Sequence, residues 1–144
     1  MKLPEYVTKP EVQRVCKALG LRDWTKMKDY KVSLKEAKRI LKEIDSRSMK
    51  IEPEQFRIGL EVELEHGMMY KEANVTNNHP VITGMIVLAH MKESLDYYRR
   101  LEVAELEGDL HKAIASGNAA KAKSYYKRIT KAKTALAEAE GRRL

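Results

Sequence analysis

The chain has 144 residues, of which 43% are hydrophobic and 34% are charged, and its formal net charge is +7. This length and composition fit one domain with a helical appendage, and they exclude disordered, collagen-like and low-complexity chains. No apolar run approaches the roughly 18 residues of a membrane span, and the N-terminus lacks the apolar core of a secretory signal. The single cysteine, Cys16, has no partner for an internal disulfide. We therefore expect a cytoplasmic protein that is neither secreted nor membrane-bound.

Two capping boxes mark the beginnings of the first helices. The stretches Thr8–Glu11 and Ser33–Glu36 each place a hydroxyl residue three positions before a glutamate. Residues 21–32, between these helices, lack helical periodicity, and we expect Trp24 to anchor them. Residues 45–50 are expected to connect the second helix to the third.

Three further helices are predicted along the rest of the chain. The third begins at a proline and ends at a glycine, over residues 53–67, and residues 68–79 form a loop. The fourth begins at Pro80 and extends to about residue 116, as one helix or as two. Gly117 and Asn118 read as the end of that helix and the cap of the next. We expect helices over residues 9–19, 34–45, 53–67, 80–116 and 119–140.

The last helix carries an apolar stripe along one face. Leu106, Leu110 and Ala113 of the preceding helix are expected to pack against it as a helical hairpin. No strand pattern competes, so the predicted fold class is all-α, a small helical bundle with a long central helix and a basic C-terminal helical hairpin. We expect a helical core domain over residues 1–100 and the hairpin over residues 101–144. The stripe consists of Ala122, Tyr126, Ile129, Ala132, Leu136 and Ala139.

The third predicted helix places one carboxylate on its apolar face. At about 100° per residue, Glu63 falls inside the apolar arc, and His66 lies one turn further along the same face. Glu61 and Glu65 are expected to point towards water. A carboxylate on an apolar face is costly to bury unless it is paired or coordinated.

The fourth helix repeats this chemistry in reverse. His90 and Glu93 lie three residues apart in an otherwise apolar column. If the two helices pack antiparallel, Glu63, His66, His90 and Glu93 converge. A Glu-x-x-His pair from each of two helices is half of a carboxylate-bridged dinuclear metal site, and a mononuclear zinc, iron or manganese site needs fewer ligands. The same four residues also suit a buried hydrogen-bonded network that fixes the helix register.

Catalysis finds less support in the sequence. Glu63 or Glu93 has the chemistry of a general base. However, there is no nucleophile elbow, phosphate-cradling glycine loop or Cys–His arrangement. Cys16 is expected to be a small buried hydrophobe, and His79 and His111 to lie on the surface. We therefore expect a protein that is not an enzyme.

The excess positive charge belongs to the C-terminal segment. Residues 1–117 carry 20 basic and 19 acidic residues, whereas residues 118–144 carry eight basic and two acidic residues. A basic helix of this kind binds phosphates or an acidic protein surface, or is a solvated helix face. The eight candidate partner-binding residues are Lys121, Lys123, Lys127, Arg128, Lys131, Lys133, Arg142 and Arg143.

Several stretches resemble an uncharacterised family of small helical proteins found in phage and bacterial genomes. The two longest are Gly-Leu-Glu-Val-Glu-Leu-Glu-His-Gly at residues 59–67 and Ala-His-x-x-Glu-x-x-Asp-Tyr-Tyr at residues 89–98. Asn-Val-Thr-Asn at residues 74–77 is a third. The family pattern places acidic residues before the proline, where this chain has Asn78 and His79. The resemblance implies a phage-type accessory or virion protein, and the basic hairpin lies outside the matching stretches.

Together these features predict a non-enzymatic helical structural or accessory protein, a virion or assembly component of phage type. Its partners would be copies of itself or phage structural proteins, with the hairpin on an acidic protein surface or on nucleic acid, in the host cytoplasm or in the virion. One alternative is a metal-binding protein or metalloenzyme built on Glu63, His66, His90 and Glu93. A second is a nucleic-acid-binding module that uses the last helix but has no recognisable recognition motif.

Overall fold

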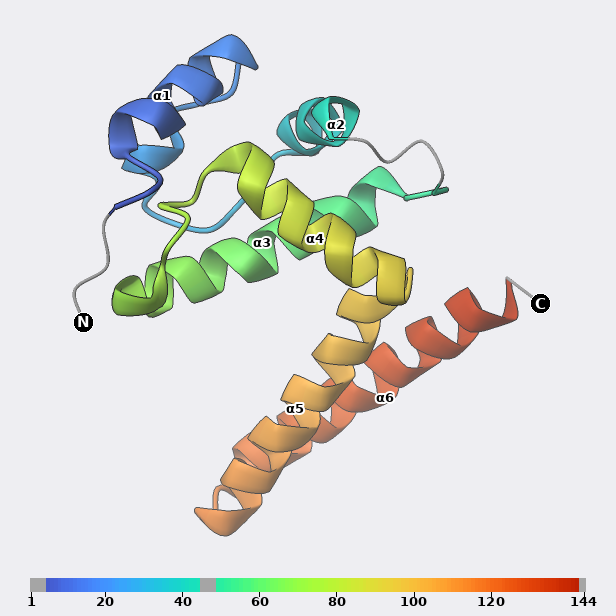
Figure 1. Cartoon of the computed structure of the whole chain (residues 1–144). Coiled ribbons are helices and arrows are strands. Elements are labelled where there is room, and N and C mark those ends of the chain that lie inside the picture. The colour runs from blue at the N-terminus through green and yellow to red at the C-terminus, as the bar shows by residue number, and fades with distance from the viewer. Residues whose placement is uncertain (1–4, 45–48, 143–144) are drawn as a thin grey trace. The chain divides into compact units, whose positions relative to one another are not determined.

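The computed structural model describes residues 5–44 and 49–142, and within them every regular element is helical. This confirms the all-α prediction (Figure 1). No helix among the described residues combines the length and the hydropathy of a membrane-spanning segment. The predicted connector overlaps residues 45–48, which lie outside the description. The elements are α1 (Lys9–Ala18), η1 (Trp24–Lys26), α2 (Leu34–Glu43), α3 (Pro53–Met69), η2 (Lys71–Ala73), α4 (Pro80–Glu93), α5 (Tyr97–Ala115) and α6 (Ala119–Gly141).

The chain forms two compact units. We call residues 1–92 unit 1 and residues 93–144 unit 2. The chain passes from one to the other at Lys92–Glu93, earlier than the domain boundary predicted at residue 100. Unit 1 contains α1 to α4 and the two 3-10 helices η1 and η2, and unit 2 contains α5 and α6.

The predicted caps hold the helix beginnings. The Thr8 hydroxyl accepts a hydrogen bond from the Glu11 amide at 3.4 Å, and Ser33 and Glu36 form a complete capping box. Asn118 caps α6 by accepting from the Lys121 amide at 3.0 Å. Each cap satisfies amide groups that have no partner within the first turn of a helix.

The core of unit 1 lies where α2, α3 and α4 approach one another. Val12, Ile40, Phe56, Leu60 and Val87 are fully buried in unit 1. The helix α4 packs closely because residue 84 is a glycine, and a Cβ built there would lie 2.7 Å from Cγ2 of Ile40 and 3.3 Å from Cζ of Phe56. The approach of these three helices therefore depends on the small residue.

The helix α3 does not end at Gly67, as the sequence predicts, but continues to Met69. Gly67 is not a C-terminal cap, because positive φ among the described glycines occurs only at Gly20 and Gly117. Its lack of a side chain matters for another reason. A Cβ at Gly67 would lie 2.6 Å from Oδ1 of Asn78 and 3.0 Å from Nδ2 of Asn74, so the loop before α4 packs directly on this turn of α3.

The segment predicted as one long helix or two, residues 80–116, is two helices. The helix α4 ends at Glu93, and α5 begins at Tyr97. At the break, the Ser94 hydroxyl accepts from the Asp96 amide and the Ser94 carbonyl accepts from the Tyr97 amide. These local bonds replace the helical pattern with a turn.

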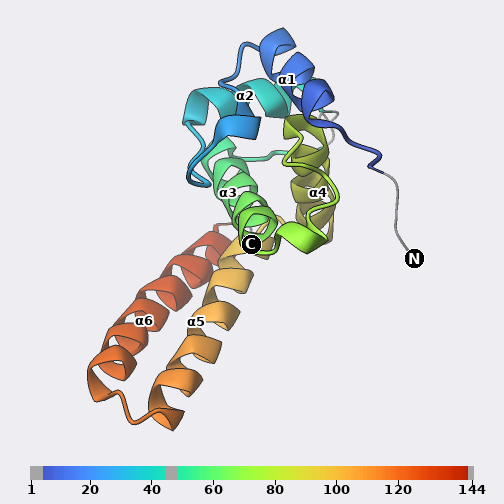
Figure 2. The ribbon, with the colours of Figure 1, turned by 90° about the vertical axis from the view of Figure 1, so that its left-hand side faces the viewer.

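Unit 2 is an antiparallel helical hairpin, and α5 and α6 lie side by side (Figure 2). Gly117 turns the chain with a φ of +68°, as expected for the glycine after a helix. Most of the predicted apolar stripe faces α5, but Tyr126 does not, because 67% of it is exposed. Tyr125 packs against α5 instead, because the residues of α6 that contact α5 follow the seven-residue repeat of paired helices. The hairpin core contains Val103, Leu106, Ile129 and Ala132, with Leu110, Tyr125 and Leu136 packed against it.

Candidate functional site

The structure brings together one glutamate and one histidine of the predicted four. Nδ1 of His90 on α4 lies 3.2 Å from Oε1 of Glu63 on α3, and both side chains are partly buried. This pair joins two helices of unit 1, as the sequence predicts for the facing sides of α3 and α4. A carboxylate at Nδ1 fixes the orientation of an imidazole ring.

The other two residues of the predicted set do not join this pair in a cluster. His66 is exposed near the end of α3, and Glu93 is exposed at the end of α4. Within the described ranges, no three His, Cys, Asp or Glu side chains gather in a group that could hold a metal ion. The zinc, iron or manganese site therefore stays a prediction from the sequence.

A small groove lies beside the Glu63–His90 pair. Its volume is about 200 Å³, and Glu63, His66, Tyr70, Thr76 and Thr83 are among the residues that line it. This volume is below the several hundred Å³ that organic ligands usually occupy. The arrangement suits a polar contact between helices better than a substrate pocket.

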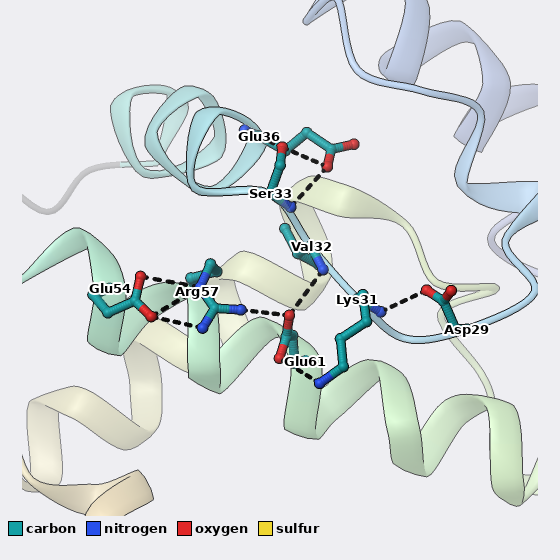
Figure 3. A network of polar contacts seen from close by, with 8 residues as sticks. All are labelled: Asp29, Lys31, Val32, Ser33, Glu36, Glu54, Arg57 and Glu61. Atoms are coloured by element: carbon teal, nitrogen blue, oxygen red, sulfur yellow. Dashed lines mark hydrogen bonds and ion pairs between the residues drawn. The ribbon is translucent and has the colours of Figure 1, made fainter.

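The buried carboxylate of α3 is Glu61, and the prediction that it points towards water is wrong. Glu61 accepts from the Val32 amide at 3.0 Å, from Nζ of Lys31 at 3.3 Å and from Nη1 of Arg57 at 2.5 Å (Figure 3). The segment before α2 covers this side of α3, which a helical wheel cannot reveal. Glu61 thus ties the segment to the helix.

Arg57 extends this network along α3. Its guanidinium also binds Glu54, with donor–acceptor distances of 2.6 to 3.1 Å. The hydrogen bonds to Arg57 lower the pKa of Glu54, and those to Glu54 are the main reason that the pKa of Arg57 is raised. These charges hold one another in place within unit 1.

A second buried carboxylate, Glu36, holds the beginning of α2 against η1. Its carboxylate accepts from Nε1 of Trp24 at 3.2 Å and from the amide and hydroxyl of Ser33 at 3.0 and 2.9 Å. Burial opposes ionisation, but the bonds from Ser33 and Trp24 and the charge of Arg22 together lower the pKa of Glu36. Trp24 is 1% exposed, which confirms it as the anchor of its segment.

His79 is buried, and the prediction of a surface histidine is wrong at this position. It lies immediately before α4, and its Nδ1 accepts from the Ile82 amide at 3.3 Å, so the ring caps the helix. Burial lowers the pKa of His79, although Glu11, 4.0 Å from Nε2, opposes the shift. His111 is exposed as predicted. Cys16 is buried as predicted, and burial raises the pKa of its thiol.

The basic residues of α6 form a defined column on the side away from α5. Lys123, Lys127 and Lys131 recur every four residues, so they lie above one another on the outer face, and we call them the basic stripe. All three are exposed. Residues 118–137 contain no aspartate or glutamate, and in the described part of the chain none of the three lysines forms an ion pair.

The other predicted basic residues lie around the stripe or outside the description. Lys133 pairs with Glu107 of α5 at 2.6 Å, and the guanidinium of Arg128 lies 5.6 Å from the ring centre of Tyr125. Lys121 and Arg142 are exposed. Arg143 lies outside the described residues.

Unit 1 contains a polar groove, lined by three lysines, that the sequence does not predict. Lys9, Lys28 and Lys71 come from three segments, and Asn77 and Asn78 line the same groove. No linear spacing relates the three lysines, so only the fold brings them together. The one signal in the sequence is the asparagine-rich stretch at residues 74–78, which contains the Asn-Val-Thr-Asn motif.

The comparisons with known proteins agree with the predicted uncharacterised family. A family model described as "Protein of unknown function (DUF5661)" matches residues 12–107. No curated protein matches the chain, and no solved structure matches it. The match covers most of unit 1 and part of α5, whereas α6 lies beyond it. Because the family model matches about two thirds of the sequence, the chain belongs to the DUF5661 family.

Proposed function

We propose that this protein is a non-enzymatic helical accessory protein, a component of a larger assembly of phage type, that binds nucleic acid through the basic stripe of α6. The observation that carries the proposal is the column of Lys123, Lys127 and Lys131 on an exposed face without acidic neighbours. The assembly role rests on the family resemblance.

The stripe is unfavourable for the isolated helix. Like charges four residues apart destabilise a helix by about 0.2–0.5 kcal/mol per pair, and the stripe contains two such pairs. A polyanion removes this repulsion and releases its own counterions when lysines neutralise its phosphates. The energetic gain therefore appears on binding rather than on folding.

The geometry of the stripe matches a linear array of phosphates. At 1.5 Å per residue, the three lysines span about 12 Å along the helix axis. Double-stranded DNA carries one charge for about every 1.7 Å of its axis, so a lysine column meets phosphates at any register. Tyr126, which is 67% exposed, lies on the same helix and supplies an aromatic surface beside the lysines.

An acidic protein surface is the other partner that a basic stripe fits, and salt dependence alone does not distinguish it. We therefore expect a labelled 20-base-pair duplex, but not labelled polyglutamate at the same salt concentration, to bind the protein tightly. Three phosphate contacts predict a slope of about −2.7 for the logarithm of the binding constant against that of the salt concentration.

The deciding variant is the triple change Lys123→Glu, Lys127→Glu and Lys131→Glu. We expect it to abolish duplex binding, measured by fluorescence anisotropy, while circular dichroism shows unchanged helicity. The matched control changes three exposed lysines of unit 1, Lys17, Lys35 and Lys38, to glutamate, which alters the net charge equally. Equal losses in both triple variants would contradict the stripe as the site, and tighter binding of polyglutamate would assign it to an acidic protein.

A further inference from the structure

The polar groove of unit 1 lies between segments far apart in the sequence. Its volume is about 610 Å³, and its walls include the first residue of α1, the segment after η1, the end of α3 and the loop before α4. This volume falls within the usual range of small-ligand sites. Met27 and Met68, which are partly buried, contribute apolar surface to it.

The charged residues that line the groove are all lysines. Lys9, Lys28 and Lys71 line it, and its lining contains no aspartate or glutamate. All three lysines are exposed, and within the described ranges none of them forms an ion pair. This differs from the rest of unit 1, where Glu61 and Glu36 each hold a cation. Three lysines that line one groove favour an anion in it.

One wall of the groove is a preorganised loop. Asn77 and Asn78 both have positive φ, +47° and +58°, a conformation that non-glycine residues adopt uncommonly. Hydrogen bonds hold this wall in place: Nδ2 of Asn74 donates to the Gly67 carbonyl at 3.0 Å and to Oδ1 of Asn78 at 2.8 Å. The side chain of Asn77 donates to the Val7 carbonyl at 2.5 Å and to Oε1 of Glu5 at 2.7 Å.

The loop adds hydrogen-bond donors to the charge of the lysines. Oδ1 of Asn78 accepts from Asn74, and the amide NH₂ group of this groove-lining side chain supplies two further N–H donors. Strained backbone that its surroundings hold in place recurs at ligand sites. The groove thus combines three lysines, the amide of Asn78 and a wall held by hydrogen bonds.

We infer that this groove binds a small molecule that carries a phosphate group. Lysine ammonium groups bind phosphate as point charges, and charge-assisted hydrogen bonds are about twice as strong as neutral ones. The apolar surface from Met27 and Met68 gives an organic part of the ligand a place beside its phosphate. Free phosphate and a phosphate ester share the recognised group, and the experiment distinguishes them.

This inference goes beyond the proposed function and is independent of it, because the groove residues belong to unit 1 and the basic stripe belongs to α6. Variants of the groove should leave duplex binding unchanged, and variants of the basic stripe should leave phosphate binding unchanged. Duplex binding that depends on the stripe and phosphate binding that depends on the groove therefore stand or fall separately.

The test is an NMR titration of the full chain with inorganic phosphate and, separately, with adenosine diphosphate, at constant ionic strength set with chloride. We expect saturable shifts of the amides of Lys71, Asn77 and Asn78. The changes Lys28→Gln and Lys71→Gln should each weaken binding about tenfold, as the loss of one charge-assisted bond predicts. Lys17→Gln, an exposed lysine of α1 outside the groove, should leave the affinity unchanged.

Binding of either probe supports the inference if it depends on the groove lysines. Tighter binding of adenosine diphosphate than of inorganic phosphate identifies the ligand as a phosphate ester rather than the free ion. The inference is overturned if the amide shifts do not saturate with either probe by about 10 mM. Such binding would have a free energy weaker than about −3 kcal/mol. The inference is equally overturned if Lys17→Gln weakens binding as much as Lys28→Gln, or if only a nucleic-acid duplex shifts the groove amides.

Discussion

Unit 1 and α6 of unit 2 use charged residues in opposite ways. In unit 1, Glu61 and Glu36 are buried, and each accepts several hydrogen bonds from neighbouring segments. On α6, Lys123 and Lys127 are exposed and repel each other along one face. The comparison indicates that buried charge holds segments of unit 1 together, whereas the lysines of the basic column form no ion pair among the described residues.

The two units also differ in the size of their cores. Phe56, Leu60 and Ile40 are fully buried in unit 1, alongside Trp24. In unit 2 the core is a single seam between two helices, and its buried members include the small residue Ala132. Truncations of core side chains should therefore cost unit 1 more than unit 2.

The largest expected effect is that of Phe56→Ala. Removing this ring from a fully buried position should lower the free energy of unfolding by about 3–5 kcal/mol, measured by urea denaturation. Ile129→Ala in the seam of unit 2 should cost about 2–3 kcal/mol, because its neighbours can close part of the cavity. The control is Ile114→Ala, at a position 62% exposed, which should change stability by less than about 0.5 kcal/mol. A smaller loss for Phe56→Ala than for Ile129→Ala would reverse the ranking of the two cores.

Glu61→Ala tests the buried charges of unit 1. It leaves the Val32 amide and part of Arg57 without an acceptor, so we expect a loss of about 1–3 kcal/mol in urea denaturation. Glu65→Ala, one turn further along α3, serves as the matched control and should cost less, because the network around Glu61 stays intact. Equal losses at the two positions would mean that the network contributes no stability.

The elements of the fold follow from local signals, but the environments of single residues do not. Thr8, Ser33 and Asn118 predict where three helices begin, because a cap needs only the residues of one turn. Glu61 and His79 were placed on the surface because a helical wheel and a loop assignment ignore segments that pack from elsewhere. The sequence also cannot show which lysines share a groove, since only tertiary structure brings them together.

The Glu–His faces illustrate the same limit. The spacing of Glu63 and His66, and of His90 and Glu93, correctly selects the facing sides of α3 and α4, because the contact between Glu63 and His90 forms there. The spacing cannot determine how far each side chain extends or where α4 ends. It therefore does not predict that His66 and Glu93 are exposed.

His79 links the stability of unit 1 to pH. Its folded pKa lies below the ordinary value of 6.5 because of burial, so its contribution is complete above pH 6.5 and is lost as the pH falls towards the folded pKa. We expect His79→Asn, which keeps an acceptor at the cap, to reduce the loss of stability below pH 6.5 in urea denaturation at several pH values. His111→Asn, at an exposed site, should leave the pH dependence as in the wild type.

The smallest expected effect concerns the basic stripe, where Lys127→Glu should raise stability while it weakens duplex binding. The change replaces two repulsive pairs with attractive ones, so the free energy of unfolding of the hairpin should rise by a few tenths of a kcal/mol at low salt. Lys112→Glu is the matched charge reversal on α5, and it should lower stability because Lys112 pairs with Asp109 at 3.3 Å.

A loss of stability in Lys127→Glu would show that this lysine supports the hairpin itself, and the contrast between the charges of unit 1 and those of α6 would disappear. A gain in stability together with a loss of binding is what the proposed role of the basic stripe predicts, because the repulsion between its lysines costs stability that a bound polyanion relieves.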